Sequence, residues 1–181
     1  MVNIKNLRNI ILCAGRFNPP TKAHGYLFEQ MIELGNKHNL RPEVFIVEGE
    51  KSSQTSDNPL GANYIYELLS KAYPEIKFDI ASSAYHVMEI LEVQAKKPMI
   101  WIAGSDRVKN YNKLLQYAGF LESRVMEISR DSGMFQGISA TKTRQAAIDN
   151  NFEEFCSLIS SNLCQIDKKK IFDKVRERNG L

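Results

Sequence analysis

The 181 residues, 43% hydrophobic and 25% charged, have the balance of a globular domain that buries a full core without disulfides. The first apolar run, Ile10 to Ala14, is too short for a signal peptide, and no run approaches the length of a membrane span. We therefore expect a cytoplasmic protein with no membrane partner. Cys13, Cys156 and Cys164 stand without a CxxC motif or a Cys/His cluster, which argues against a disulfide framework and a zinc site.

The formal net charge of +3 arises in the last segment, 165–181, where basic side chains outnumber acidic ones. No aromatic residues alternate with these charges in a way that would stack nucleic-acid bases. A basic terminal helix of this kind is typically a solvated face, so nucleic acid is not an expected partner.

Short apolar runs rich in β-branched residues alternate with longer segments of helical period, which is typical of a parallel sheet with crossover helices. The predicted strands are Asn9–Ala14, Glu43–Glu48, Lys77–Ala81, Pro98–Ala103 and Arg124–Ser129. An amphipathic helix follows the first strand and ends near Gly35 or Asn36, with an inward face of Leu27, Phe28, Met31, Ile32 and Leu34. Further helices are predicted at Ala62–Ala72, Tyr85–Lys96 and Val108–Tyr117.

The stretches 49–61 and 130–137 lack either period and are rich in turn formers, which predicts functional loops. The chain beyond them is predicted to be wholly helical, with two apolar stripes: Ile148, Phe152, Phe155, Cys156 and Ile159, then Ile171, Phe172 and Val175. The expected fold class is α/β, a Rossmann-like open and mostly parallel five-stranded sheet with flanking helices. Residues 1–150 would form this domain, and residues 151–181 a C-terminal helical extension packed on it.

The segment GRFNPPTKAH, Gly15 to His24, lies where the first strand ends and the first helix begins. In an open parallel sheet, ligands bind outside the carboxyl ends of the strands, and a helix N-terminus offers unpaired N–H groups to anions. Gly15 lets a ligand approach the backbone closely, and Arg16 can form bidentate hydrogen bonds with phosphate oxygens. Thr21 would cap the helix or contact phosphate, and His24 would face the same site.

Taken singly, these residues also fit an ordinary strand–loop–helix connection with a capping threonine and a surface histidine. The conjunction of Gly, Arg, Phe-Asn-Pro, Thr and His in one short segment favours a phosphate site instead. The sequence has no GxxxxGK[ST] and no GxGxxG, which argues against a P-loop NTPase and a dinucleotide-binding oxidoreductase.

A second segment, GISATKTR from Gly137 to Arg144, opens a helix that is predicted to run to about Asn150. Ser139 is a good N-cap, and Thr141, Lys142 and Arg144 add a hydroxyl and two cations to the first turns, where phosphate oxygens are favoured. A capped helix with an exposed basic face is the alternative interpretation. Two helix starts of the phosphate-binding type in one small sheet protein favour a triphosphate ligand.

A third segment, WIAGSDR from Trp101 to Arg107, ends the fourth predicted strand. Gly104 permits close approach of a ligand, and the Asp106 carboxylate can accept hydrogen bonds from ribose hydroxyls. A helix N-cap after a strand is the alternative interpretation of this segment. Lys51, in the loop after the second strand, can reach a phosphate, although a solvated lysine fits equally well.

These three segments together resemble the nucleotidylyltransferase superfamily, whose signature is (H/T)xGH near the N-terminus and ISSTxxR nearer the C-terminus. GxFNPxTxxH with ISATKTR is most similar to its nicotinamide-mononucleotide adenylyltransferase branch, and the ordered motifs also resemble nucleotidyltransferase-like proteins of large tailed phages. The resemblance spans roughly Ile10 to Asn150. The sequence departs from the signature at Ala23, where the family has Gly, and at Ala140, where it has the second Ser.

The resemblance implies transfer of an adenylyl group from ATP to a small phosphate-bearing acceptor such as nicotinamide mononucleotide. Mg²⁺ would arrive with the nucleotide, because no carboxylate pair is placed as a metal cage. His24 would donate to the α-phosphate, and Thr21 and Arg144 would be further catalytic residues. The implied nucleotide-binding residues are Gly15, Arg16, Phe17, Asn18, Lys51, Gly104, Asp106, Ile138, Ser139, Thr141 and Arg144.

Three alternatives stay open at this stage. The fold also fits a cytidylyltransferase that uses CTP, or an adenylyltransferase for another phosphate, such as a pantetheine or flavin phosphate. A catalytically weak nucleotide-binding or virion-associated protein is the alternative of another class. A homo-oligomer is compatible with the apolar stripes of the last helices, and a phage-encoded protein would act in the host cytoplasm.

Overall fold

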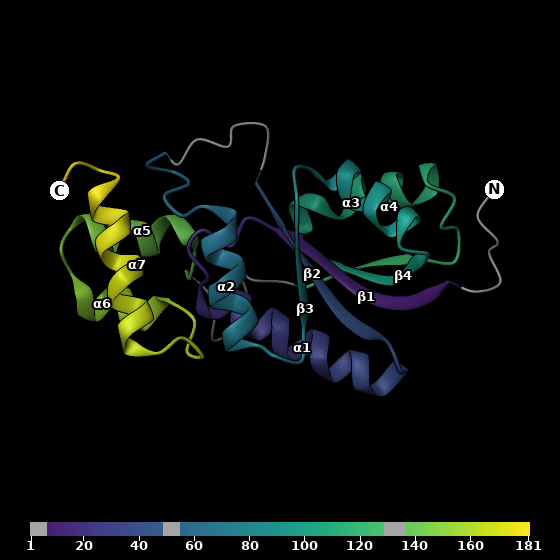
Figure 1. Ribbon diagram of the computed structural model, residues 1–181, viewed down its shortest axis with the longest axis horizontal. Coiled ribbons are helices and arrows are strands. Elements are labelled where there is room, and N and C mark those ends of the chain that lie inside the picture. The colour runs from purple at the N-terminus through teal and green to yellow at the C-terminus, as the bar shows by residue number, and fades with distance from the viewer. Residues whose placement is uncertain (1–6, 49–54, 129–136) are drawn as a thin grey trace.

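A computed structural model describes residues 7–48, 55–128 and 137–181 of the chain (Figure 1). Its elements, in chain order, are β1 (Arg8–Gly15), α1 (Lys22–His38), β2 (Arg41–Val47), α2 (Ala62–Ala72), β3 (Lys77–Ala81), α3 (Ala84–Val93), β4 (Lys96–Ala103), α4 (Ser105–Tyr117), β5 (Arg124–Glu127), α5 (Ala140–Ile148), α6 (Phe152–Leu158) and α7 (Gln165–Glu177). The expected α/β fold is confirmed.

The five strands form one sheet in the order β3-β2-β1-β4-β5, and every neighbouring pair is parallel. The chain moves outward from β1 to β3 and then returns to β4 on the other side of β1. Because crossover connections are right-handed, this reversal sends α1 and α2 to one face of the sheet and α3 and α4 to the other (Figure 1). The reversal point, between β1 and β4, is where such sheets bind ligands.

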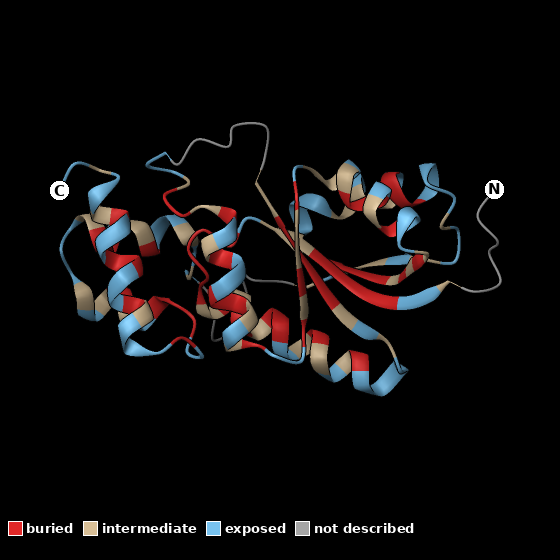
Figure 2. Cartoon of the chain, viewed as in Figure 1, coloured by how far each residue is buried: buried red, intermediate tan, exposed pale blue. Residues whose placement is uncertain are grey.

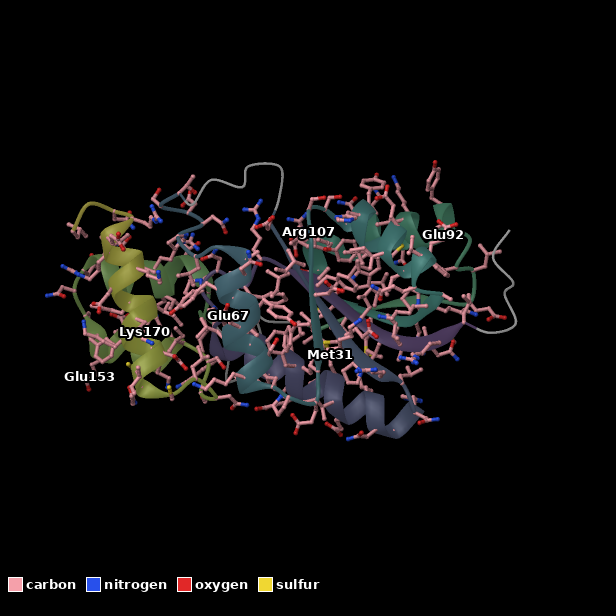
Figure 3. All side chains as sticks on the ribbon, in the orientation of Figure 1. Met31, Glu67, Glu92, Arg107, Glu153 and Lys170 are labelled. Carbon is pink, nitrogen blue, oxygen red and sulfur yellow. The ribbon has the colours of Figure 1, made fainter. Side chains whose placement is uncertain are left out.

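Both faces of the central strands are buried, as Figure 2 shows for the middle of the sheet. The period of two along β1 sends Ile11 to the core under α1 and α2, and Leu12 to the core under α3 and α4. Met31 of α1, labelled in Figure 3, is fully buried in the first of these cores. Strands buried on both faces read as continuous apolar runs, which is why the sequence pattern located them.

The structure corrects two predicted helix ends. Helix α1 runs past Gly35 to His38, and Asn39 in the left-handed conformation ends it. Gly35 is instead a packing residue, because a Cβ there would lie 2.7 Å from the carbonyl oxygen of Leu40. Helix α3 ends at Val93 rather than at the predicted Lys96, because Ala95 adopts a positive φ of 52° and turns the chain into β4.

The prediction of one stripe from Ile148 to Ile159 was wrong. The chain leaves helix α5 at Asp149, turns at Asn150 with a φ of 56°, and restarts at the Asn151 cap of α6. Ile159 is extended rather than helical. The break places α6 and α7 beside α5 at the C-terminal end of the molecule (Figure 1).

Residues of the C-terminal helices share a hydrophobic core with the sheet domain, since Phe155 and Phe172 belong to the same cluster as Phe28. Arg176 of α7 donates to the carbonyl oxygens of Ala147 at 2.9 Å and Ile148 at 3.4 Å, which satisfies the end of α5. The division of the chain at residue 150 into two domains stays a prediction. None of the described helices is long and apolar enough to cross a membrane.

Candidate active site

A cleft of about 710 Å³ opens at the carboxyl ends of β1 and β4. It is formed by the β1–α1 loop and the first turns of α1, α3, α4 and α5. Eight of the residues predicted from the sequence line it: Gly15, Arg16, Phe17, Asn18, His24, Gly104, Asp106 and Arg144. Segments more than a hundred residues apart in the sequence therefore meet at one site, as the motif interpretation required.

The orientation of His24 is fixed by the cap of α1. The backbone N–H of Thr21 donates to Nδ1 of His24 at 3.0 Å, and the His24 N–H donates back to the Thr21 hydroxyl at 3.4 Å. This reciprocal pair is a capping box with histidine in the place usually held by Glu or Gln. A backbone N–H can only donate, so Nδ1 is the acceptor and the proton of the neutral ring sits on Nε2.

Thr21 itself does not line the cleft. Its side chain is 1% exposed, and its hydroxyl serves the helix cap and lies 3.1 Å from His24 Nδ1. The structure thus gives Thr21 the capping role that the sequence offered as one of two options. Contact between Thr21 and phosphate stays a prediction without support from this geometry.

Phe17 holds the other side of the histidine. It is buried with a φ of 51°, and its ring packs edge-on against the His24 ring at a centroid distance of 5.1 Å. A Cβ at Gly15 would lie 3.0 Å from the tip of the Phe17 ring, which is tighter than an ordinary contact, so glycine fits best beside this ring. Gly15 therefore makes room for Phe17 as well as for a ligand.

Asn18 joins the β1–α1 loop to the loop before α2. Its amide nitrogen donates to the carbonyl oxygen of Leu60 at 2.8 Å and to Asn58 Oδ1 at 2.5 Å, and its amide oxygen accepts from the Leu60 N–H at 3.1 Å. The side chain is buried, and these bonds satisfy both the nitrogen and the oxygen of its amide. Asn18 acts in this structure as a clamp, and its direct contact with nucleotide stays a prediction.

Arg144 joins the second motif to the first. Its guanidinium donates to the carbonyl oxygen of Asn18 at 2.8 Å and to the Thr141 hydroxyl at 3.3 Å, and it lies 3.7 Å from the Asp57 carboxylate. Burial lowers the pKa of Arg144, while the nearby Asp57 opposes that shift. The side chain is only 13% exposed, so its charge is poorly screened by water and available to an anion in the cleft.

The charges around the cleft favour an anionic ligand. Arg16, Arg107 and Arg144 line it against Asp57 and Asp106. Both acids already lie near arginines, since Asp106 pairs with Arg107 at 3.1 Å and Asp57 is close to Arg144. Among the residues that the structure describes, the exposed Arg16 has no hydrogen-bond or ion-pair partner, so it is available to a ligand. Figure 3 labels Arg107 on the same side of the sheet as α3 and α4.

The helix starts differ in what they offer a ligand. Gly104 is the N-cap of α4 and has no side chain to cap it, and the Arg107 N–H donates to the Gly104 carbonyl oxygen at 3.0 Å. The positive end of the helix dipole at this start favours an anion. Ser139 caps α5 by accepting from the Lys142 N–H at 3.1 Å, as predicted. Ser139, Thr141 and Ile138 lie at this helix start but outside the cleft lining, which Ala140 and Arg144 provide. Lys51 lies outside the described residues.

Sequence reasoning missed part of the lining. Ser82 and Ser83 contribute the start of α3, where Ser83 caps the helix, and the pair of serines after a strand was the available signal. Tyr111 lines the wall from α4 and stacks on the buried Trp101 at 4.1 Å. Asp57 was hidden because its loop has no regular period. The structure places Ala23 in the core at 3% exposure, so a small residue fits there.

Comparison with solved structures shows the same fold elsewhere. Among 61 matching chains is a macrolide-efflux protein from Streptococcus pneumoniae, with a TM-score of 0.58 and 20% sequence identity. The alignment covers 86% of this chain and 57% of that one, so this chain spans little more than half of its structural relative. At that identity the likeness concerns the fold alone. Comparison with curated protein sequences gives no match.

A comparison with protein-family models matches the region that contains the cleft and the two motifs. A model described as cytidylyltransferase-like matches residues 12–146, which include the second half of β1, the capping box of His24, the start of α4 and Arg144. The match therefore covers every residue that lines the cleft, and it leaves the helices α6 and α7 outside. With most of the chain matched, the protein belongs to the cytidylyltransferase-like family of nucleotidyltransferases.

Proposed function

We propose that this nucleotidyltransferase moves an adenylyl group from ATP to a small phosphate-bearing acceptor, with nicotinamide mononucleotide as the first candidate and NAD as its product. The observation that carries the proposal is the Thr21–His24 bond of 3.0 Å. It leaves Nε2 of His24 as the hydrogen-bond donor beside a cleft lined by Arg16 and Arg144. A fixed donor in a cleft that two cations also line suits a triphosphate that gains charge during transfer.

The proposed reaction needs no covalent intermediate. An oxygen of the acceptor phosphate attacks the α-phosphorus of ATP, and the bond from that phosphorus to the oxygen bridging to the β-phosphate breaks, so pyrophosphate leaves. Arg16 and Arg144 bind the triphosphate charge, and the start of α4, where Gly104 lines the cleft, binds a further anionic group. His24 donates from Nε2 to an α-phosphate oxygen. Catalysis is then positioning and charge stabilisation.

The cleft fits a metal that arrives with its nucleotide. Among the described residues, no group of three or more His, Cys, Asp or Glu could hold a metal ion alone. Mg²⁺ typically uses one or two carboxylates together with substrate phosphates, and Asp57 and Asp106 line the cleft. Mg²⁺ would neutralise triphosphate charge when bound. Asp57 and Asp106 would hold it together with the phosphates of the nucleotide.

Three other candidates keep the same cleft. A CTP-dependent enzyme or another phosphate acceptor would use the same phosphate-binding groups, because base and acceptor choice depend on other contacts. A binding protein without turnover is motivated by Ala140, which lines the cleft where the family signature has a hydroxyl. Homo-oligomerisation and action in the cytoplasm stay predictions.

A panel of nucleotides and acceptors tests the proposal. ATP and CTP are each combined with nicotinamide mononucleotide, a pantetheine phosphate and a flavin phosphate in the presence of Mg²⁺, and pyrophosphate release is measured. We expect release with ATP and one acceptor. Release with CTP alone would replace the adenylyl assignment by a cytidylyl one. Nucleotide binding without release from any pair would contradict an enzyme and favour the binding protein.

A further inference from the structure

The C-terminal segment that follows α6 is built into the backbone of the first motif. Ile159 forms an antiparallel bridge with Thr21, and the Ser160 N–H donates to the carbonyl oxygen of Pro20 at 3.0 Å. Thr21 and Ser160 are each 1% exposed. Residues beyond the matched family region therefore hold the backbone that orients His24.

The Ser160 side chain forms a second contact with the start of α1. Its hydroxyl lies 2.7 Å from the hydroxyl of Tyr73, the residue that ends α2, and both side chains are buried. A Cβ added to Gly25 would lie 2.7 Å from the Tyr73 hydroxyl oxygen and 3.4 Å from the Ser160 hydroxyl oxygen. The hydroxyl pair thus presses against the first turn of α1, one residue after His24.

A line of packed rings joins Tyr73 to His24 independently of the backbone. The ring of Tyr73 lies 5.0 Å from Phe28, Phe28 lies 5.3 Å from Phe17, and Phe17 lies 5.1 Å from His24, measured between centroids. Displacement of Tyr73 would therefore be felt at the imidazole by two routes, through the α1 backbone and through these rings. Close-packed interiors transmit such shifts.

We propose that Tyr73 and Ser160 are positioning residues for His24. Their hydrogen bond fixes the first turn of α1 against the C-terminal segment, which keeps the Thr21 N–H aimed at Nδ1 and the Nε2 proton on the cleft side. The catalytic consequence rests on the proposed function, whereas the effect on the imidazole does not. An ordinary buried hydrogen bond would stabilise the fold without any effect on His24.

Three substitutions test the proposal: Tyr73→Phe and Ser160→Ala, which each delete the bond, and Ser160→Cys, which keeps a weak donor of similar size. Tyr64→Phe is the matched control, because it removes a hydroxyl from the same helix, and that hydroxyl has no hydrogen-bond partner among the described residues. The ¹⁵N and ¹H signals of the His24 ring are recorded in the ligand-free protein. Single-turnover rates and ATP dissociation constants follow with the best acceptor of the panel.

We expect the deletions to move the His24 ring signals away from those of the single Nε2–H tautomer. Turnover should fall about tenfold, with ATP affinity changed by less than about twofold, because a misplaced donor affects the transition state more than ground-state binding. Ser160→Cys should retain part of the rate, and Tyr64→Phe should match the parent in every measurement.

Folded variants whose His24 signals match the parent would overturn the proposal, even with a lower melting temperature. So would loss of folding in all three variants, because the pair would then serve the fold as a whole. A chain without transfer activity would defeat the proposed function only. In that case the ring signals alone decide the positioning role.

Discussion

The backbone N–H of Thr21 donates to Nδ1 of His24 at 3.0 Å, so one bond serves both as a helix cap and as the orientation of an imidazole. In most capping boxes the returning side chain is Glu or Gln. Here the returning ring also lines the cleft. Changes to the cap should therefore affect stability and activity together.

Replacement of Thr21 by Val keeps the shape and removes the hydroxyl that accepts from the His24 N–H. We expect the free energy of unfolding to fall by about 1 kcal/mol, the usual cost of losing an N-cap acceptor. Thr21→Ser keeps the oxygen and should cost less. Urea denaturation of the two variants measures the difference, and equal stability would show that the hydroxyl does not cap α1.

Arg16 and Arg144 should contribute alike to nucleotide affinity and differently to stability. Loss of a charge-assisted bond typically costs ~1.5–3 kcal/mol, so either Ala variant should bind ATP about tenfold or more weakly in calorimetric titration. Only Arg144→Ala should also lower the melting temperature, because Arg144 bonds the Asn18 carbonyl. Arg41→Ala is the control, because Arg41 is exposed at the amino end of β2 and does not line the cleft. Unchanged affinity in both arginine variants would remove the phosphate assignment.

Asn18→Ala should destabilise the fold strongly, because it leaves the N–H and the carbonyl oxygen of Leu60 without their partner. An unsatisfied buried polar group costs ~1–3 kcal/mol, so the free energy of unfolding should fall by at least that amount. Chemical denaturation measures the change. A variant with parental stability and weaker ATP binding would instead support the direct nucleotide contact predicted from the sequence.

Removing one partner of the buried ion pair Glu43–Lys96 should destabilise the fold more than replacing both partners by apolar residues. Lys96 Nζ lies 2.5 Å from Glu43 Oε2, burial lowers the Lys96 pKa, and Glu43 Oε1 has no hydrogen-bond partner among the described residues. Lys96→Met should lower the free energy of unfolding by ~3–5 kcal/mol, because it leaves the buried Glu43 carboxylate without its ion-pair partner. The double variant Glu43→Leu/Lys96→Met should regain most of that loss. A double variant as unstable as the single one would contradict this account.

Local signals account for most of what the sequence predicted. Strands buried on both faces gave apolar runs, and the predicted Lys77–Ala81 and Ala62–Ala72 coincide with β3 and α2. The phosphate motifs were found because their residues are contiguous. The failures are equally local: a single residue with a positive φ, Ala95 or Asn150, ended a helix whose apolar period appeared to continue.

Contacts between distant segments had no signal in a single sequence. Asn18 bonds Leu60 across 42 residues, and Tyr73 contacts Ser160 across 87. Motif-based prediction assigns Asn18 to the ligand because Asn18 lies in the motif, and it overlooks Ser160 because Ser160 lies outside the motif. Only the topology, which brings the C-terminal segment back to α1, shows what these side chains hold.

The rate at which His24→Ala transfers the nucleotide tests the central claim most directly. If Nε2 donates to charge growing on the α-phosphate, single-turnover rates should fall on the order of a hundredfold, while the ATP dissociation constant changes much less. His86→Ala is the matched control, because Nδ1 of His86 also accepts from a backbone N–H at a helix start, that of Ser82 at 3.1 Å, and His86 is not part of the cleft lining. A His24→Ala variant that turns over at the parental rate would contradict the account.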